Sequence, residues 1–259
     1  MVQEAEIVPY HLSGPPGERV VVFAPHPDDE TLGCGGTISL LVDAKKKIKV
    51  LFLTSGDKAE SGGKGFSGGE HNTEYSLVRE REAERALGVL GVSEYEFLRF
   101  PDRGIHEHYP DALKRLLESV ESFSADTIYS PSMVELNPDH RATAALSMEI
   151  QRRYMRSSAE GGNRVPIRIV FYEVTTPLRP NILVDIDSVY RRKKRALKRY
   201  RSQLKQRDYF GHITALNTVR ALTVNGPRYV EAFWCTERPV SEDEIADWLS
   251  YRKTLTPGY

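Results

Sequence analysis

The chain has 259 residues, of which 40% are hydrophobic and 28% charged, a composition typical of globular proteins that excludes a disordered or fibrous one. Its formal net charge is zero, which argues against general binding of nucleic acid or another polyanion. Two cysteines are too few for a disulfide framework, and no signal peptide or membrane-spanning apolar run is evident. We therefore expect a cytoplasmic protein without a membrane partner, folded as one domain over residues 1–259.

The first 150 residues alternate between strand and helix patterns. The apolar run Val20–Phe23 predicts a buried strand over about 19–24, followed by a helix to about residue 44. Alternation of this kind indicates an α/β fold with a largely parallel sheet and right-handed crossovers. The further elements expected here are strands at about 48–54, 95–99 and 126–130, and helices at about 74–90, 111–123 and 138–156.

The remaining residues predict a continuation of the sheet with mixed strand directions. Between the second strand and its helix, residues 55–73 are rich in Gly and Ser, which is typical of a mobile loop beside an active site. The elements expected in the last third are strands at 167–174, 181–186 and 226–233, and helices at about 188–207 and 241–252.

One stretch carries an unusual concentration of acidic side chains. Between the first strand and its helix stands Pro25–Glu30, in which His26 is followed by Asp28, Asp29 and Glu30. Open α/β sheets bind their ligands at the carboxyl ends of strands. Three carboxylates and an imidazole crowded there repel one another unless a cation joins them, and a divalent metal is the simplest candidate.

A metal site of this kind needs a third protein ligand. His26 and Asp29 lie on one tight turn, which can aim both side chains at one point. The best further candidate is His140, which also follows a predicted strand and stands in the first turn of a helix. Two histidines and one carboxylate suit several divalent metals, so the donor set alone leaves the metal open.

The segment Ala24–Glu30 resembles the (A)HPDDE signature of the LmbE-like, or PIG-L, family of zinc-dependent N-deacetylases. Further family blocks follow in the same order, and the resemblance covers roughly residues 19–234. They are Arg79-x-x-Glu82 before Leu90-Gly91, Phe97–Asp102, Pro138–Arg141, Lys194 through Gln203, and Glu231–Phe233.

The resemblance implies a Rossmann-like sheet flanked by helices, and removal of an acetyl group from a sugar of the N-acetylglucosamine type. It implies that His26, Asp29 and His140 bind one Zn²⁺ ion, with Asp28 as the general base. Arg79 and Asp102 match positions that contact the sugar in relatives, although a solvated helix residue and a turn residue are equally good readings.

The chain departs from the family at Asn137, where many members carry a histidine. An asparagine amide can donate a hydrogen bond to the reacting carbonyl but cannot transfer a proton. Asn137 therefore either keeps a weakened catalytic role, is replaced in it by His106 or His108, or only caps the helix. Glu30 is expected to hydrogen-bond a metal ligand or to favour the helix N-terminus, and Asp139 to support the ligands.

Two other patterns have ordinary explanations. The glycines Gly33, Gly35 and Gly36 fail the dinucleotide-binding spacing and instead allow a close approach of the helix. The basic run 191–207 carries an apolar stripe at helical spacing, so we expect a packed helix with a solvated basic face and no nucleic acid partner. That face also suits an anionic sugar conjugate.

The leading hypothesis is thus a metal-dependent N-deacetylase acting on an N-acetylated sugar or a conjugate of one. A metal-dependent amidase acting on non-sugar amides would use the same residues. A glycan-binding module with little activity is the third possibility, and Asn137 is its only support. A homo-oligomer is possible, since relatives are often oligomeric.

Overall fold

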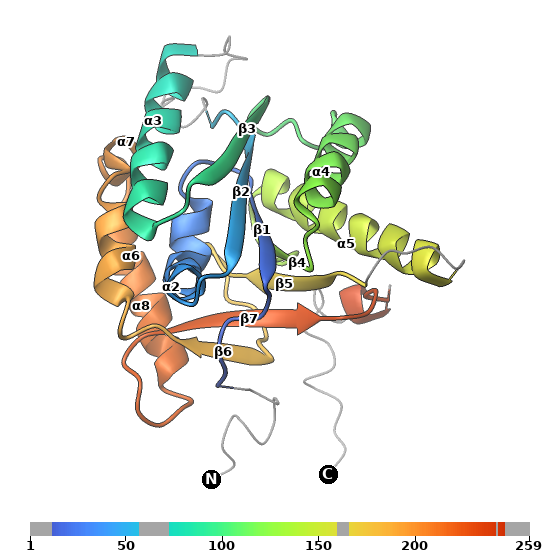
Figure 1. Cartoon of the computed structure of the whole chain (residues 1–259). Helices are drawn as coiled ribbons and strands as arrows, with labels where there is room; N and C mark the ends of the chain where they lie inside the picture. Colours follow the sequence, from blue (N-terminus) through green and yellow to red (C-terminus); the bar gives the residue numbers. More distant parts are fainter. Residues whose placement is uncertain (1–11, 57–72, 160–165, 242, 247–259) are drawn as a thin grey trace.

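The computed structural model describes residues 12–56, 73–159, 166–241 and 243–246 (Figure 1). Its strands are β1 (Arg19–Ala24), β2 (Lys47–Thr54), β3 (Glu94–Phe100), β4 (Thr127–Pro131), β5 (Arg168–Tyr172), β6 (Ile182–Asp185) and β7 (Val230–Thr236). Its helices are α2 (Asp29–Asp43), α3 (Thr73–Leu90), α4 (Tyr109–Phe123), α5 (Pro138–Ala159), α6 (Tyr190–Leu197), α7 (Arg201–Leu204) and α8 (Tyr209–Ala221). Most of the predicted loop over 55–73 and of the predicted helix over 241–252 lies outside the described residues.

The strands form one sheet in the order β3-β2-β1-β4-β5-β7-β6. The five strands from β3 to β5 are parallel, whereas β7 runs antiparallel to both of its neighbours, β5 and β6. The prediction of a mostly parallel sheet with a mixed C-terminal portion is therefore confirmed.

Helices cover both faces of the sheet (Figure 1). Successive side chains of β1 point to opposite faces, so Val20 and Val22 pack with α2, α3 and α6, whereas Val21 and Phe23 pack with α4 and α5. Because both faces are buried, β1 and β2 read as continuous apolar runs rather than alternating ones. No helix among the described residues combines the length and apolar character needed to cross a membrane.

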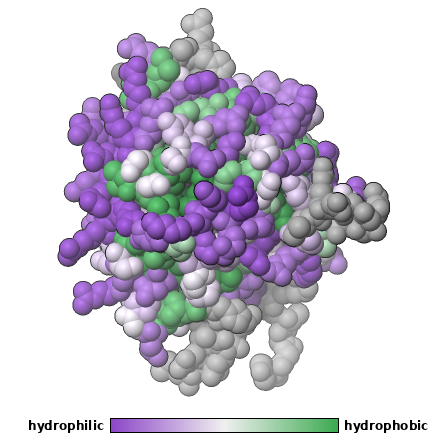
Figure 2. All heavy atoms as spheres, in the orientation of Figure 1, coloured by the Kyte–Doolittle hydropathy of each residue, from purple (hydrophilic) through white to green (hydrophobic). Residues whose placement is uncertain are grey.

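The exterior alternates in polarity over short distances. On the face shown in Figure 2, hydrophilic residues surround small, separate hydrophobic areas. Scattered apolar groups of this kind are normal on a protein surface and do not mark a binding site by themselves.

The order of the strands creates a crevice between β1 and β4. From β1 the chain crosses one face of the sheet through α2 to β2, and from β4 it crosses the other face through α5 to β5. The loops that leave the carboxyl ends of β1 and β4 therefore diverge, and the crevice between them is where such sheets bind ligands.

Close packing of α2 on the sheet depends on its glycines. A Cβ atom at Gly33 would lie 2.2 Å from the ring of Tyr172, and one at Gly36 would lie 2.7 Å from the side chain of Ile186. At Cys34 between them, the helix leaves helical geometry (φ −138°). The expectation that these glycines permit close approach is confirmed.

The predicted single helix over 188–207 is wrong. The chain forms α6, breaks at Lys198–Tyr200, and forms the short α7. The break lets the buried Tyr200 hydroxyl donate a hydrogen bond to Glu30 at 2.5 Å, a long-range contact that the helical pattern does not reveal. Helix α8 was not predicted, and β7 begins and ends later than the predicted 226–233.

Candidate metal centre

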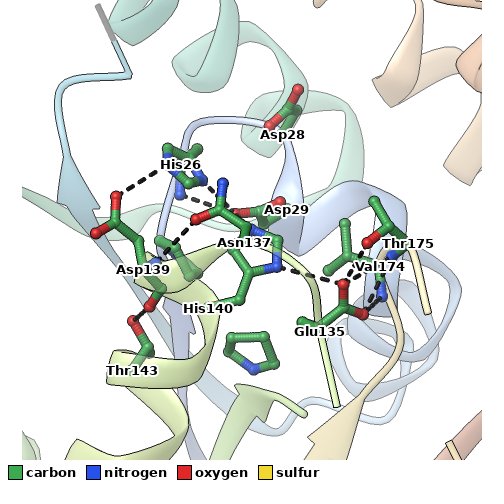
Figure 3. A network of polar contacts seen from close by, with 12 residues as sticks. His26, Asp28, Asp29, Glu135, Asn137, Asp139, His140, Thr143, Val174 and Thr175 are labelled. Atoms are coloured by element: carbon green, nitrogen blue, oxygen red, sulfur yellow. Dashed lines mark hydrogen bonds and ion pairs between the residues drawn. The ribbon is translucent and has the colours of Figure 1, made fainter. Parts of the chain in front are cut away.

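Two loops at the crevice bring the predicted ligands together. The loop after β1 carries His26 and runs directly into α2, whose first residue is Asp29. The loop after β4 runs into α5, whose first turn carries His140. All three side chains are buried, and Figure 3 shows both imidazole rings beside the Asp29 carboxylate.

The geometry of these three residues fits a metal site. Oδ2 of Asp29 lies 3.1 Å from Nδ1 of His26 and 3.1 Å from Nε2 of His140. One ligand atom from each residue lies within 4.8 Å of the others. Two ring nitrogens and one carboxylate oxygen converging in this way match the donor set of a catalytic zinc, which leaves a position open for water.

The charges of the cluster also favour a cation. Burial opposes ionisation of both partners, but their mutual attraction outweighs it: it raises the pKa of His140 to about 9 and holds the pKa of Asp29 well below its usual range. Without a metal, protons on the rings supply the positive charge that this carboxylate attracts. A divalent metal would take over that role and leave the rings neutral.

The opposite nitrogen of His26 faces two further carboxylates. Its Nε2 lies 3.2 Å from Oδ1 of Asp102 and 3.3 Å from Oδ2 of Asp139. Asp139 also accepts hydrogen bonds from the backbone N–H groups of Arg103 and Ile105, and its support of a metal ligand stays a prediction. His26, Asp102 and Asp139 form a second group with metal-ligand spacing. The sugar contact expected of Asp102 stays a prediction.

Glu135 lies in the loop between β4 and α5, and its place beside the site was not predicted from the sequence. Its Oε2 lies 3.6 Å from Nδ1 of His140. The same carboxylate accepts hydrogen bonds from the backbone N–H groups of Val174, Thr175 and Thr176 and from the Thr175 hydroxyl (Figure 3). A carboxylate on the far nitrogen of a metal-binding histidine fixes the orientation of the ring. Its position just before the His140 motif was the only available signal.

Asp28 lies beside His26, Asp29 and His140, and Figure 3 draws no contact between its side chain and theirs. Its Oδ1 accepts a hydrogen bond from Nη2 of Arg79 at 3.1 Å. Burial raises the pKa of Asp28 to about 7, although the positive charge of Arg79 opposes that rise. A buried carboxyl group with a pKa close to neutral is suited to take up and return a proton.

Arg79 and Glu30 are both held by hydrogen bonds near the start of α2. The Arg79 side chain is buried, with its guanidinium group against the loop that carries Asp28. Glu30 accepts hydrogen bonds from Tyr200, Thr31 and the backbone N–H of Asp28. Among the described residues these hydrogen bonds do not reach a ligand side chain directly, and the support of a ligand by Glu30 stays a prediction.

Asn137 is engaged at the start of α5. Its Oδ1 accepts a hydrogen bond from the backbone N–H of Asp139 at 2.8 Å, which is the interaction of a helix cap. The histidines considered as substitutes lie elsewhere: His106 is exposed and lies 3.7 Å from Glu107, and His108 packs near Phe100. Neither has a contact with the three candidate ligands among the described residues.

Helix α8 begins with Tyr209, whose hydroxyl is influenced by the acidic side chains of the site. Burial, together with the negative charges of Asp28 and Asp29, raises the pKa of Tyr209 to about 12. Tyr209 therefore stays a neutral hydroxyl that can donate a hydrogen bond. Sequence analysis could not place it, because α8 itself was not predicted.

Comparison with known proteins gives relatives that are named deacetylases. The diacetylchitobiose deacetylase of Thermococcus kodakarensis is 29% identical over 195 residues, which are 72% of this chain and 70% of that protein. A probable N-acetyl-alpha-D-glucosaminyl L-malate deacetylase 2 of Bacillus anthracis is 29% identical over 130 residues, covering 48% of this chain and 55% of that protein.

A solved structure shares the fold. The N,N'-diacetylchitobiose deacetylase from Pyrococcus horikoshii aligns with a TM-score of 0.72 at 23% sequence identity, covering 90% of each chain. The family model described as GlcNAc-PI de-N-acetylase matches residues 21–151, a span that contains all three candidate ligands and Asp28. The chain therefore belongs to the PIG-L, or LmbE-like, family.

Proposed function

We propose that this protein is a metal-dependent N-deacetylase that removes the acetyl group from an N-acetylglucosamine-type sugar or a conjugate of one. The main observation behind the proposal is that His26, Asp29 and His140 converge on one point. The carboxylate of Asp28 lies beside them and is not one of the three candidate ligands. The deacetylase relatives support both the reaction and the class of substrate.

The proposed metal is Zn²⁺, one per chain, held by His26, Asp29 and His140. Two imidazoles and a carboxylate suit zinc and also several other divalent ions. When bound, such an ion makes a water molecule acidic near neutral pH and polarises the amide carbonyl.

The proton transfers fall to Asp28. An amide resists hydrolysis because water is a weak nucleophile and an amine is a poor leaving group. We assign to Asp28 the removal of a proton from the attacking water and its return to the departing nitrogen. The products are then acetate and the free amino sugar, and one carboxyl group serves as both base and acid.

Asn137 has a narrower role in this scheme. Its Oδ1 caps α5, so only the Nδ2 amide is left to donate a hydrogen bond to the acetyl carbonyl. A donor aimed at the developing oxyanion stabilises the transition state without transferring a proton. The resemblance implies sugar contacts from both Arg79 and Asp102, and the scheme proposed here includes the one from Asp102.

The decisive experiment is a release assay on the zinc-loaded protein. N-acetylglucosamine, its disaccharide, and conjugates with and without a negative charge form one arm, and N-acetylated amides without a sugar form the other. The expected result is equimolar acetate and primary amine from the sugar arm. Turnover confined to the non-sugar arm would show an amidase instead, and sugar binding without any product would show a binding module.

The cellular setting is part of the proposal. We expect the enzyme to work in the cytoplasm on a diffusible sugar, without nucleic acid or membrane as partners, and homo-oligomer formation stays possible. Fractionation of cells and light scattering of the purified protein test these points directly.

A further inference from the structure

Asp28 has a backbone conformation that is unfavourable for any residue with a side chain. Its φ angle is +130° with ψ −25°, at the turn between β1 and α2. Strain of this kind costs energy and persists only when the surroundings hold the residue in place. The backbone N–H of Asp28 donates to Glu30, and its carbonyl oxygen accepts from the N–H groups of Thr31 and Leu32. These contacts hold the backbone, but they do not aim the carboxylate.

Arg79 provides the contact that does. From α3, its Nη2 donates to the carbonyl oxygen of Pro27 and to Oδ1 of Asp28, the latter at 3.1 Å. Its Nη1 donates to the carbonyl oxygen of Gly56 at 2.8 Å. The guanidinium group thus joins the carboxylate of Asp28 to the backbone of two loops, the one after β1 at Pro27 and the one after β2 at Gly56. The Arg79 residue is only 3% exposed.

Gly56 leaves the space that this guanidinium group fills. It follows β2, is buried, and has a φ angle of +61°. A Cβ atom at this position would lie 2.2 Å from Nη1 of Arg79 and 2.8 Å from its Cζ. The backbone conformation favours glycine and the guanidinium group leaves no room for a Cβ atom, so any other residue at position 56 has to displace that group.

We propose that Arg79, seated against Gly56, is a positioning residue that aims the carboxylate of Asp28 at the attacking water, rather than a sugar-binding residue. The inference rests on the proposed function, because it concerns how Asp28 reaches its proton. Oδ1 of Asp28 is held by Arg79, which leaves the other carboxylate oxygen for the transfer. A lysine at position 79 keeps the charge but lacks the planar fork that reaches Pro27, Gly56 and Asp28 together.

The test compares three variants with the wild type in the zinc-loaded enzyme. Arg79→Lys and Gly56→Ala are expected to lower kcat about 10²-fold with KM changed less than about twofold, since a small misplacement of a reacting group has effects of that size. Gly226→Ala is the matched control: its φ is also positive (+114°), but a Cβ atom there meets nothing within 4 Å. It is expected to keep the wild-type kcat.

The double variant Arg79→Lys/Gly56→Ala adds a second criterion. Because both changes act on Asp28 through one guanidinium group, the loss in kcat should equal that of Arg79→Lys alone rather than the product of the two. Thermal unfolding and zinc content of each variant exclude loss of fold or of metal as the cause.

Three results would overturn the inference. A raised KM with unchanged kcat in Arg79→Lys shows a substrate contact instead. Multiplicative losses in the double variant show that the two residues act separately. Crystal structures of wild type and Gly56→Ala give a readout without activity, and an unmoved Asp28 carboxylate in the variant refutes the positioning role. If the wild type itself releases no acetate, the proposed function fails, and the crystal structures still decide the role of Arg79.

Discussion

Oε2 of Glu135 lies 3.6 Å from Nδ1 of His140, on the side of the ring opposite to Asp29. Glu135 is at the same time the acceptor for three consecutive backbone N–H groups that follow β5. The orientation of His140 is therefore tied to the adjoining segment 174–176. This one carboxylate therefore connects the loop after β4, the first turn of α5 and the segment after β5.

Replacing Glu135 should weaken metal binding without removing a ligand. In Glu135→Gln the side chain keeps its size but loses its negative charge and part of its acceptor capacity, so His140 is held less firmly. We expect zinc affinity to fall about 10- to 100-fold, as measured by competition with a chromogenic chelator. Glu149→Gln on the outer part of α5, where Glu149 pairs with Arg153, serves as control. Equal affinities in the two variants would contradict the role of Glu135.

Asp28→Asn should separate catalysis from metal binding. The amide is nearly isosteric with the carboxylate but cannot accept a proton, and Asp28 is not among the three candidate ligands. We expect kcat to drop about 10²- to 10⁴-fold, while zinc content measured by atomic absorption stays at one ion per chain. Asp43→Asn, at an exposed ion pair with Arg192, should retain full activity. Substantial turnover by Asp28→Asn would disprove its assignment as the base.

Removal and return of the metal should change stability as well as activity. A ligand present at 100 times its dissociation constant stabilises the folded state by about 2.7 kcal/mol. Dialysis against a chelator should therefore abolish acetate release and lower the unfolding temperature, and added zinc should restore both. His140→Ala should lose the thermal response to zinc, whereas His106→Ala, at an exposed histidine away from the cluster, should keep it. The same response in both variants would mean that zinc binds elsewhere.

A second buried ion pair predicts a purely structural effect. Nζ of Lys193 lies 2.7 Å from Oε1 of Glu231, and both side chains are fully buried. Glu231 also accepts hydrogen bonds from the backbone N–H groups of Gly36 and Thr37, next to the kink in α2. Lys193→Met leaves that carboxylate unpaired and should reduce the free energy of unfolding by about 3–5 kcal/mol. Urea denaturation followed by circular dichroism measures this loss.

Lys194→Met is the control for that variant. The Nζ atom of Lys194 lies 5.8 Å from the ring centroid of Tyr190, and it makes no ion pair with a buried acid among the described residues. Its replacement should change the free energy of unfolding by less than about 1 kcal/mol. Comparable losses in the two variants would show that the buried pair with Glu231 is not the cause.

Much of the site could be predicted because its main part is local. The strand, turn and helix around His26 and Asp29 follow one another directly in residues 19–43, so hydrophobic pattern and spacing sufficed. His140 required a further step, the assumption that two strand ends are neighbours, and the pairing of β1 with β4 confirms it. The continuous apolar runs of β1 and β2 likewise follow directly from burial on both faces.

The missed features depend on contacts between distant segments. The helical pattern over 188–207 is genuine, but the hydrogen bond from Tyr200 to Glu30 competes with it and breaks the helix. Arg79 stands in a run of charged residues typical of a solvated face, and its burial results from contacts with the loops that follow β1 and β2. The spacing of Glu135 in the sequence does not reveal its role, because the backbone N–H groups that it binds follow a different strand, β5.

The candidate metal ligands come from two units of the fold that leave the sheet on opposite faces. His26 and Asp29 belong to the β1–α2 unit and His140 to the β4–α5 unit, so an ion bound to all three acts as a cross-link between segments far apart in the chain. A peptide containing only the first unit has two of the three donors. Full affinity for the ion therefore arises only after β1 and β4 have paired, and metal uptake reports on completion of the native topology.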